Sequence, residues 1–223
     1  MIVQEKLTPA QQHLWIRAQE EMVSHCYDNV LFLTNALLRS IPEFLEARKL
    51  ARQAAMVISE RTPKNFFAIA QLAIKRLVVR ARVAILVQKK QYSRAILVLE
   101  NFLAITPCDL TANCLMATVA ASWNQALLPV ALFALETALW KHPSSIFLHL
   151  DIARVALLCH QNGISQALER SITAYQEVLH VDPSHLEARQ GLKNASALLS
   201  MHDDSWKKSL TAQEAEGRTT IRL

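Results

Sequence analysis

Glycine is the residue that this sequence lacks most clearly. Only 3 glycines occur among 223 residues, and they stand far apart, at Gly163, Gly191 and Gly217. Phosphate-binding loops of the P-loop and Rossmann types need several glycines at fixed offsets within one turn, and an all-β fold needs many turn signals of this kind. The scarcity of glycine therefore excludes those nucleotide-binding loops and indicates a helical chain rich in alanine and leucine.

The four cysteines include no Cys-x-x-Cys pair of the kind that binds zinc or carries redox chemistry. Cys26, Cys108, Cys114 and Cys159 each lie among apolar residues, where a free thiol packs as a small hydrophobic side chain. Disulfides are rare in reducing compartments. We therefore expect four reduced cysteines in the core of a cytoplasmic protein.

Long uninterrupted apolar runs are also missing. Residues 1–12 are polar and lack the apolar segment of a signal peptide. The longest apolar stretch, Phe66–Val87, contains four Lys or Arg residues, which a membrane-spanning helix tolerates poorly. Hydrophobic residues still make up 52% of the sequence, enough to build a large folded core. The expectation is a folded chain without a transmembrane segment.

No constellation of residues typical of an active site is present. The 8 histidines do not cluster at the spacing of metal ligands, and no serine-hydrolase, zinc-protease or kinase motif occurs. Cys159 and His160 are adjacent, so their side chains diverge on a helix and cannot act together as nucleophile and base. We expect a protein without catalytic residues, bound metal or cofactor.

Proline marks a repeated pattern along the chain. Residues 42–48, Pro-Glu-Phe-Leu-Glu-Ala-Arg, align with residues 183–189, Pro-Ser-His-Leu-Glu-Ala-Arg. Pro107 and Pro143 follow apolar helical runs in the same way, and the four prolines are successively 65, 36 and 40 residues apart. For a repeat of about 34 residues, the first spacing corresponds to two units and each of the others to one unit with a small insertion.

The segment Tyr92–Pro107 resembles the second helix of a tetratricopeptide repeat, with Ala95 as the small contact residue and Leu99 and Phe102 packed inward. Similar patterns recur three times: Val130, Ala131, Leu135 and Pro143; Tyr175, Val178 and Pro183; Tyr27, Leu37 and Pro42. The resemblance covers about residues 10–200 and implies an all-α fold, a right-handed superhelical stack of antiparallel helix hairpins (a TPR-like α-solenoid). Trp140 ends one such helix and is expected to pack between repeats.

Apolar periodicity and helix-start signals predict about ten helices. Thr8 to Gln11 and Ser184 to Glu187 have the form of capping boxes. We assign residues 1–200 to one helical repeat domain and residues 201–223 to a polar C-terminal tail that contains one candidate capping helix. The expected helices span 9–23, 27–40, 43–59, 64–89, 92–105, 110–124, 129–141, 145–161, 165–180 and 184–200, and the fourth is either continuous or broken near its middle.

Acidic residues are absent between Arg61 and Arg94, a stretch that contains nine Lys or Arg residues. Such a surface either attracts an acidic partner or is a solvated helix face that pairs with acids on neighbouring helices and contributes little. If it binds a partner, the expected binding residues are Lys75, Arg76, Arg80 and Arg82, together with Asn113 on the first helix of the following repeat.

These patterns favour a non-catalytic scaffold or adaptor that holds a peptide or helix of a partner protein in the groove of the repeat stack. The basic stretch is expected to orient an acidic partner. One alternative is a basic protein that binds anionic lipid or nucleic acid at its surface. Few aromatic residues accompany the basic stretch, which disfavours nucleic acid. Another alternative, a chaperone for a secreted or membrane protein, depends on analogy with other helical-repeat chaperones. The sequence leaves the oligomeric state open.

Overall fold

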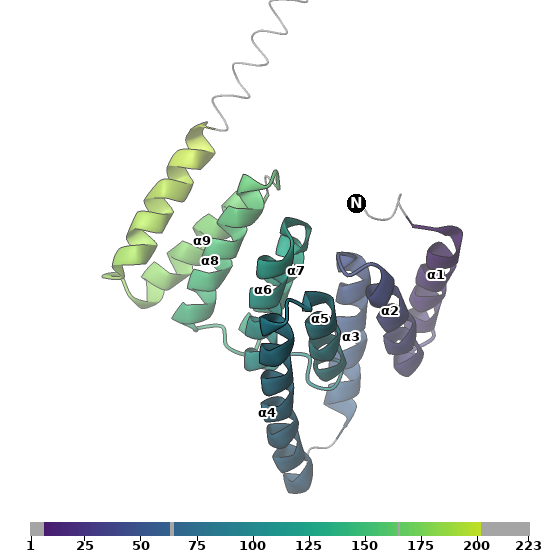
Figure 1. The fold of residues 1–223 in the computed structure, drawn as a ribbon. Helices are drawn as coiled ribbons and strands as arrows, with labels where there is room; N and C mark the ends of the chain where they lie inside the picture. Colours follow the sequence, from purple (N-terminus) through teal and green to yellow (C-terminus); the bar gives the residue numbers. More distant parts are fainter. Residues whose placement is uncertain (1–6, 63–64, 165, 202–223) are drawn as a thin grey trace, which may run out of the picture. The chain divides into compact units, whose positions relative to one another are not determined.

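The computed structural model describes residues 7–62, 65–164 and 166–201, and every regular element within these ranges is a helix (Figure 1). The helix bounds agree with the expected ones to within about two residues, because each helix is set by local apolar periodicity. The elements are α1 (Pro9–Val23), α2 (Tyr27–Ser40), α3 (Leu45–Arg61), α4 (Phe66–Gln88), α5 (Tyr92–Leu103), α6 (Leu110–Trp123), the 3-10 helix η2 (Gln125–Leu127), α7 (Leu128–Leu139), α8 (Ile146–Gln161), α9 (Ala167–Val181) and a further helix over 186–201.

The chain forms two compact units, which are described separately. The first runs to Pro143 and contains α1 to α7, and the second begins at Ser144 and contains α8, α9 and the helix over 186–201. This division falls within residues 1–200, which were predicted to form one repeat domain. The predicted tail, including Trp206, lies outside the described residues after Met201.

Consecutive helices pair as hairpins. In the first unit α1 contacts α2, α2 contacts α3, α4 contacts α5, α5 contacts α6, and α6 contacts α7; in the second unit α8 contacts α9. The step from α3 to α4 is different, since these two helices make no comparable contact. The predicted all-α architecture of antiparallel helix hairpins is confirmed, with one departure at α4. No described helix is both long and apolar enough to cross a membrane.

The residues that carry the repeat pattern form the cores of both units. Ala95, Leu99 and Phe102 are buried in the first unit, and Tyr175 and Val178 are buried in the second. Small side chains at these contacts let the helix axes approach closely, and the larger ones fill the space between them. The inward positions expected from the sequence are therefore confirmed.

Two predicted packing roles are wrong. Trp140 is 64% exposed because it caps the end of α7 and its side chain points out of the first unit's core. Cys26 is also exposed, since it stands in the turn before α2 rather than on a buried helix face. Cys108 and Cys159 are buried, as expected, and neither forms a disulfide with a described residue, while Cys114 is half-buried.

Of the two predicted capping boxes, one is confirmed. Thr8 accepts a hydrogen bond from the Gln11 amide, and the Gln11 side chain accepts one from the Thr8 amide. The box at Ser184 is wrong, because the Ser184 hydroxyl donates to the Asp182 carboxylate instead. This hydrogen bond, together with the one that the Ser184 amide donates to the same carboxylate, lowers the pKa of the Asp182 carboxyl below its usual value. The following helix is capped one residue later, where the His185 ring nitrogen accepts from a backbone amide.

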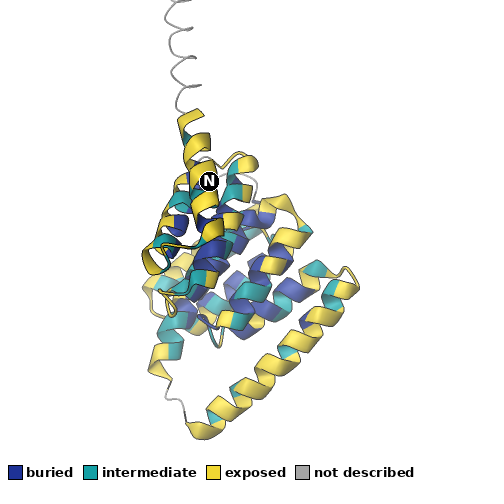
Figure 2. Cartoon of the chain, turned by 90° about the vertical axis from the view of Figure 1, so that its left-hand side faces the viewer, coloured by how far each residue is buried: buried dark blue, intermediate teal, exposed yellow. Residues whose placement is uncertain are grey.

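Helix α4 is the unusual element of the first unit. It is one continuous helix of 23 residues without a break at Lys75, and Val83 is its only buried residue. Its second half packs beside α5, whereas its first half extends away from the other helices and is mostly exposed, with Ala68 and Leu72 half-buried (Figure 2). The start of α4 is therefore a surface arm.

In the second unit, Gly191 provides the space for the buried Tyr175 ring. A Cβ atom at position 191 would lie 2.3 Å from Cζ of Tyr175. Gly191→Ala is thus expected to destabilise the second unit by a net of about 1–2 kcal/mol, because about 2–3 kcal/mol of overpacking is only partly offset by about 1 kcal/mol of gained helix propensity. Urea unfolding followed by circular dichroism measures this change. A double-mutant cycle with Tyr175→Leu should show a coupling that relieves the clash, and a Gly191→Ala protein as stable as wild type would contradict the packing.

Candidate partner-binding groove

A continuous groove runs along the side of α4 that faces α5. It consists of two adjoining hollows of about 320 and 400 Å³, which share Arg82, Val98 and Asn101. We call it the α4–α5 groove. Its floor and walls are apolar over most of their length, and its other lining residues are Ile74, Lys75, Val78, Val79, Phe102 and Ile105 in the first hollow, and Arg39, Leu86, Arg94 and Leu97 in the second.

The groove carries charge of one sign. Lys75 and Arg82 come from α4, Arg94 from α5 and Arg39 from the last turn of α2. No Asp or Glu lines either hollow, and none of these four cations has an ion-pair partner among the described residues. Four uncompensated cations beside an apolar floor create a positive potential that favours an acidic, amphipathic ligand.

Arg76 does not take part in this groove. Its Nε donates to Oδ2 of Asp109 at 2.7 Å, and its Nη2 lies 2.6 Å from the same oxygen. Asp109 is the N-cap of α6, and its Oδ1 accepts from the Ala112 amide at 2.9 Å. Arg76 therefore links α4 to the start of α6. For this residue, the interpretation that the basic stretch pairs with acids on neighbouring helices is the one that applies.

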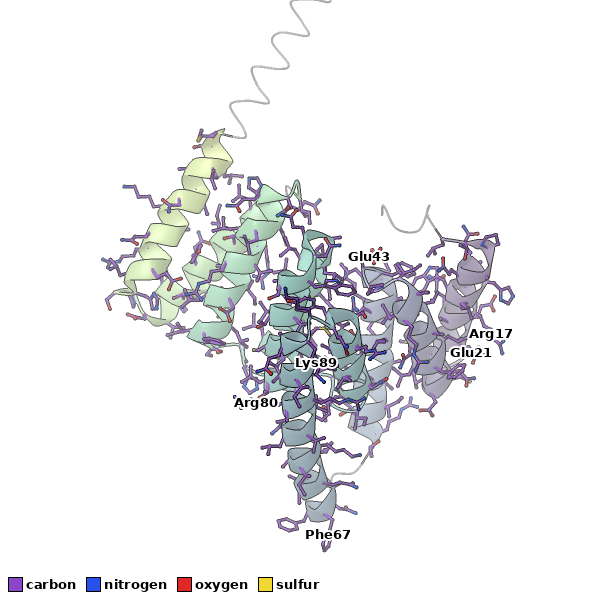
Figure 3. The ribbon with its side chains drawn as sticks, viewed as in Figure 1. Arg17, Glu21, Glu43, Phe67, Arg80 and Lys89 are labelled. Carbon is purple, nitrogen blue, oxygen red and sulfur yellow. The ribbon has the colours of Figure 1, made fainter. Side chains whose placement is uncertain are left out.

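Arg80 and Asn113 also lie elsewhere. Arg80 is exposed two residues before Arg82, so it points to the opposite side of α4 (Figure 3). Asn113 is fully buried, and its Nδ2 donates to the carbonyls of Pro107 and Asp109 at 3.0 and 2.9 Å. The amide of Asn113 thus holds the turn between α5 and α6 and does not face a partner.

Of the five predicted binding residues, the groove thus brings together Lys75 and Arg82. Sequence reasoning missed Arg39, which precedes the basic stretch, and did not single out Arg94 within it. The signal for Arg94 was its position in a second helix of a repeat, since that helix packs beside the first. Nothing in the local sequence around Arg39 marks it as part of the same surface.

A buried charge cluster lies between α3 and α5. The Arg48 Nε donates to Oε1 of Glu100, and Oε2 of Glu100 lies 3.7 Å from Nη2 of Arg52. All three side chains are buried, and burial is the main reason why the pKa of Arg52 is lowered. Arg48 also donates to the Pro42 carbonyl at 2.8 Å. One carboxylate thus holds two buried guanidinium groups and sets the position of α5 against α3.

Comparisons with known proteins give a fold likeness only. No family model matches the chain, and no curated protein matches it. A solved structure of the first TPR of Spaghetti (RPAP3) bound to HSP90 peptide SRMEEVD is similar with 19% identity and a TM-score of 0.46, over 56% of this chain and 94% of that one. A crystal structure of MamA protein is similar with 13% identity and a TM-score of 0.42, over 96% of each chain.

MamA from Desulfovibrio magneticus RS-1 gives a similar result, with 15% identity and a TM-score of 0.41 over 97% of this chain and 99% of that one. At such low identities and TM-scores we transfer no residue's role from these structures. The helix pairs of the chain itself, with their buried repeat positions, make it a divergent TPR-like helical-hairpin protein.

Proposed function

We propose that the chain is a non-catalytic interaction module that binds an acidic, amphipathic segment of a partner protein in the α4–α5 groove. The observation that carries the proposal is the coincidence of an apolar floor with four cations that have no ion-pair partner among the described residues, in a lining that contains no carboxylate. An amphipathic helix or extended peptide would place apolar side chains over Val78, Val98 and Phe102. Its acids would face Lys75 and Arg82.

The energetic roles of the two kinds of contact differ. Burying apolar side chains in the groove supplies most of the affinity, whereas the surrounding cations steer the partner and fix its direction. Because Lys75 and Arg82 lie on α4 while Arg94 lies on α5, acids on both sides of the bound segment would be recognised. The binding is therefore expected to weaken, but not to vanish, as salt is raised.

Nothing in the described part of the chain favours a reaction as the function. No group of three or more His, Cys, Asp or Glu side chains there is placed to hold a metal ion, and the groove is lined only by aliphatic, aromatic, amide and basic side chains. Guanidinium and ammonium groups with ordinary exposure bind anions but do not supply a nucleophile or base. We propose a cytoplasmic location for the module, as the reduced cysteines suggest.

The alternatives of anionic lipid and of nucleic acid use the same basic residues. A helix that lies on anionic lipid needs a polar, charged face along its length, and nucleic acid is bound by cations that neutralise successive phosphates. On α4 the charges are instead confined to the second half, beyond residue 74. A chaperone for a secreted or membrane protein would be a special case of the proposed module, in which the bound segment belongs to an unfolded client.

Selection from a displayed library of random 16-residue peptides tests the proposal without a known partner. Peptides that bind the wild-type chain should be enriched in Asp or Glu, with apolar residues at helical or alternating spacing. The same library selected on an Arg82→Glu/Arg94→Glu chain should lose the preference for acids. Enriched peptides with no excess of acidic residues would contradict the proposed chemistry of the groove.

A further inference from the structure

The first half of α4 exposes apolar side chains that no described residue of the first unit covers. Residues 66–74, which we call the apolar arm, have the sequence Phe-Phe-Ala-Ile-Ala-Gln-Leu-Ala-Ile and carry no charge. Phe66 and Phe67 are 80% and 84% exposed, and Ile69 and Ile74 are more than half exposed. Phe67 marks the free end of the helix in Figure 3. So large an exposed apolar surface indicates an interaction site.

The arm is apolar on all sides. Phe67 and Ile74 lie on the side of α4 that borders the α4–α5 groove, whereas Ile69 and Leu72 lie on the opposite side, one helical turn apart. A helix that is hydrophobic all round is normally buried in protein. A helix lying on a membrane surface needs a polar face toward water, and the arm has none.

Repeat counting indicates what is missing. The 65 residues between Pro42 and Pro107 suffice for two helix hairpins, which would be four helices, but the chain has three there: α3, α4 and α5. Helix α4, with 23 residues, is the longest described helix, and α3 and α4 do not pair as a hairpin. Residues Met56, Val57 and Ile58 near the end of α3 remain half-buried.

A hollow marks the vacant place. It has a volume of about 500 Å³ and lies between the end of α3, at Ser59, and the side of α4 formed by Ile69, Leu72 and Ala73. The turn between α5 and α6, residues 106–111, forms its base. The α4 side of this hollow is apolar and suits a third helix, while its lining also includes the Arg76–Asp109 ion pair, Lys141 and His142.

We infer that this hollow is filled by the apolar arm of a second copy of the chain, so that the protein is a two-fold symmetric dimer. The two arms cross antiparallel near Leu72, and each enters the hollow beside the other copy's α4. Such an interface is isologous, because Ile69 and Leu72 are both the inserted residues and the lining residues. Ala68 and Ala73 are small enough to let the helices approach closely.

Charge favours this occupant and this direction. The arm itself is neutral, so an acidic partner gains no ion pairs along residues 66–74, whereas a second neutral arm matches it; of the charged residues that line the hollow, Arg76 is already paired with Asp109. An antiparallel crossing places Arg80 and Arg82 of the two copies at opposite ends of the helix pair. A parallel crossing would bring the same cations side by side and repel. The α4–α5 groove lies on the other side of α4 and stays open in the dimer.

Sedimentation equilibrium across a range of concentrations tests the dimer. The wild-type chain is expected at twice its 25.1 kDa monomer mass. Ile69→Gln/Leu72→Gln removes the apolar contact without changing charge or helix propensity greatly, and the dimer should dissociate about 100-fold more readily, since four large apolar side chains are lost per dimer. Circular dichroism should show unchanged helix content, because both side chains lie outside the monomer core.

Phe32→Gln/Phe147→Gln is the matched control, since it removes two exposed apolar side chains from other helices, and it should leave the dimer intact. A wild-type chain that stays at 25.1 kDa at every concentration overturns the inference, as does a dimer that Ile69→Gln/Leu72→Gln leaves unchanged. Monomers that bind phosphatidylserine vesicles through the arm would overturn it in favour of a lipid surface. Arg82→Glu/Arg94→Glu should dimerise normally, which separates this result from the groove's binding.

Discussion

Replacing Glu100 with alanine is expected to lower the free energy of unfolding by about 3–5 kcal/mol, because two buried guanidinium groups lose the one carboxylate that pairs with them in the described part of the chain. Arg48 is fully buried and keeps one hydrogen bond, to the Pro42 carbonyl. Among the described residues, Arg52 keeps no ion-pair partner once Glu100 is gone. An uncompensated charge in the interior costs more than the missing side chain's packing. Urea unfolding monitored by circular dichroism measures the loss.

Two further variants separate the loss of the buried ion pairs from the loss of side-chain packing as the cause of the lower stability. Glu60→Ala is the matched control on an exposed carboxylate, and it should change the free energy of unfolding by less than about 0.5 kcal/mol. Replacing the whole cluster, with Arg48→Met, Arg52→Met and Glu100→Leu together, should recover most of the stability, because a buried ion-pair cluster gives little net advantage over well-packed apolar residues. A Glu100→Ala chain as stable as wild type would contradict the buried cluster.

Reversing two charges of the groove is expected to weaken partner binding by about 10- to 100-fold, which corresponds to roughly 1.4–2.8 kcal/mol. Arg82→Glu/Arg94→Glu places two carboxylates where the bound segment's acids would lie, one on α4 and one on α5. Attraction becomes repulsion at both positions. Fluorescence anisotropy with a labelled peptide selected on the wild-type chain measures the change, and the effect should shrink as salt is raised.

The control for this prediction keeps the net charge equal. Lys49→Glu/Arg80→Glu also reverses two exposed cations of the first unit, but neither lines the groove. Its affinity for the same peptide should stay within about twofold of wild type, because neither side chain lines the groove and water and salt screen exposed charges that the bound peptide does not contact. If the two variants weaken binding equally, the chain attracts acids through its overall charge and the groove has no special role.

Local patterns were enough to predict the helices. The apolar spacing within each helix and the proline at each repeat boundary are contained in short segments, so the bounds of α1, α2 and α6 follow from the sequence with little error. The inward positions followed for the same reason, as Ala95 and Leu99 show. The capping box at Ser184 failed because a nearer carboxylate, Asp182, competes for the hydroxyl.

The groove could be predicted only in part, since it is a property of tertiary packing. Lys75 and Arg82 were found as members of a basic stretch, but the same stretch contains Arg76, which is held by Asp109 from α6. Arg39 joins the groove from α2, a contact that no local pattern encodes. Likewise, nothing near Arg48 distinguishes its buried guanidinium from the exposed Lys49 beside it. Long-range pairing decides these cases.

Affinity capture from the native cell lysate tests the central claim most directly, using the wild-type chain, Arg82→Glu/Arg94→Glu and Lys49→Glu/Arg80→Glu side by side. We expect a discrete protein that binds the wild-type chain and the Lys49→Glu/Arg80→Glu chain but not the Arg82→Glu/Arg94→Glu chain. The segment of that protein that binds should be acidic and amphipathic. The same protein captured equally by all three chains, or captured material that is nucleic acid or lipid, would contradict a groove that recognises an acidic protein segment.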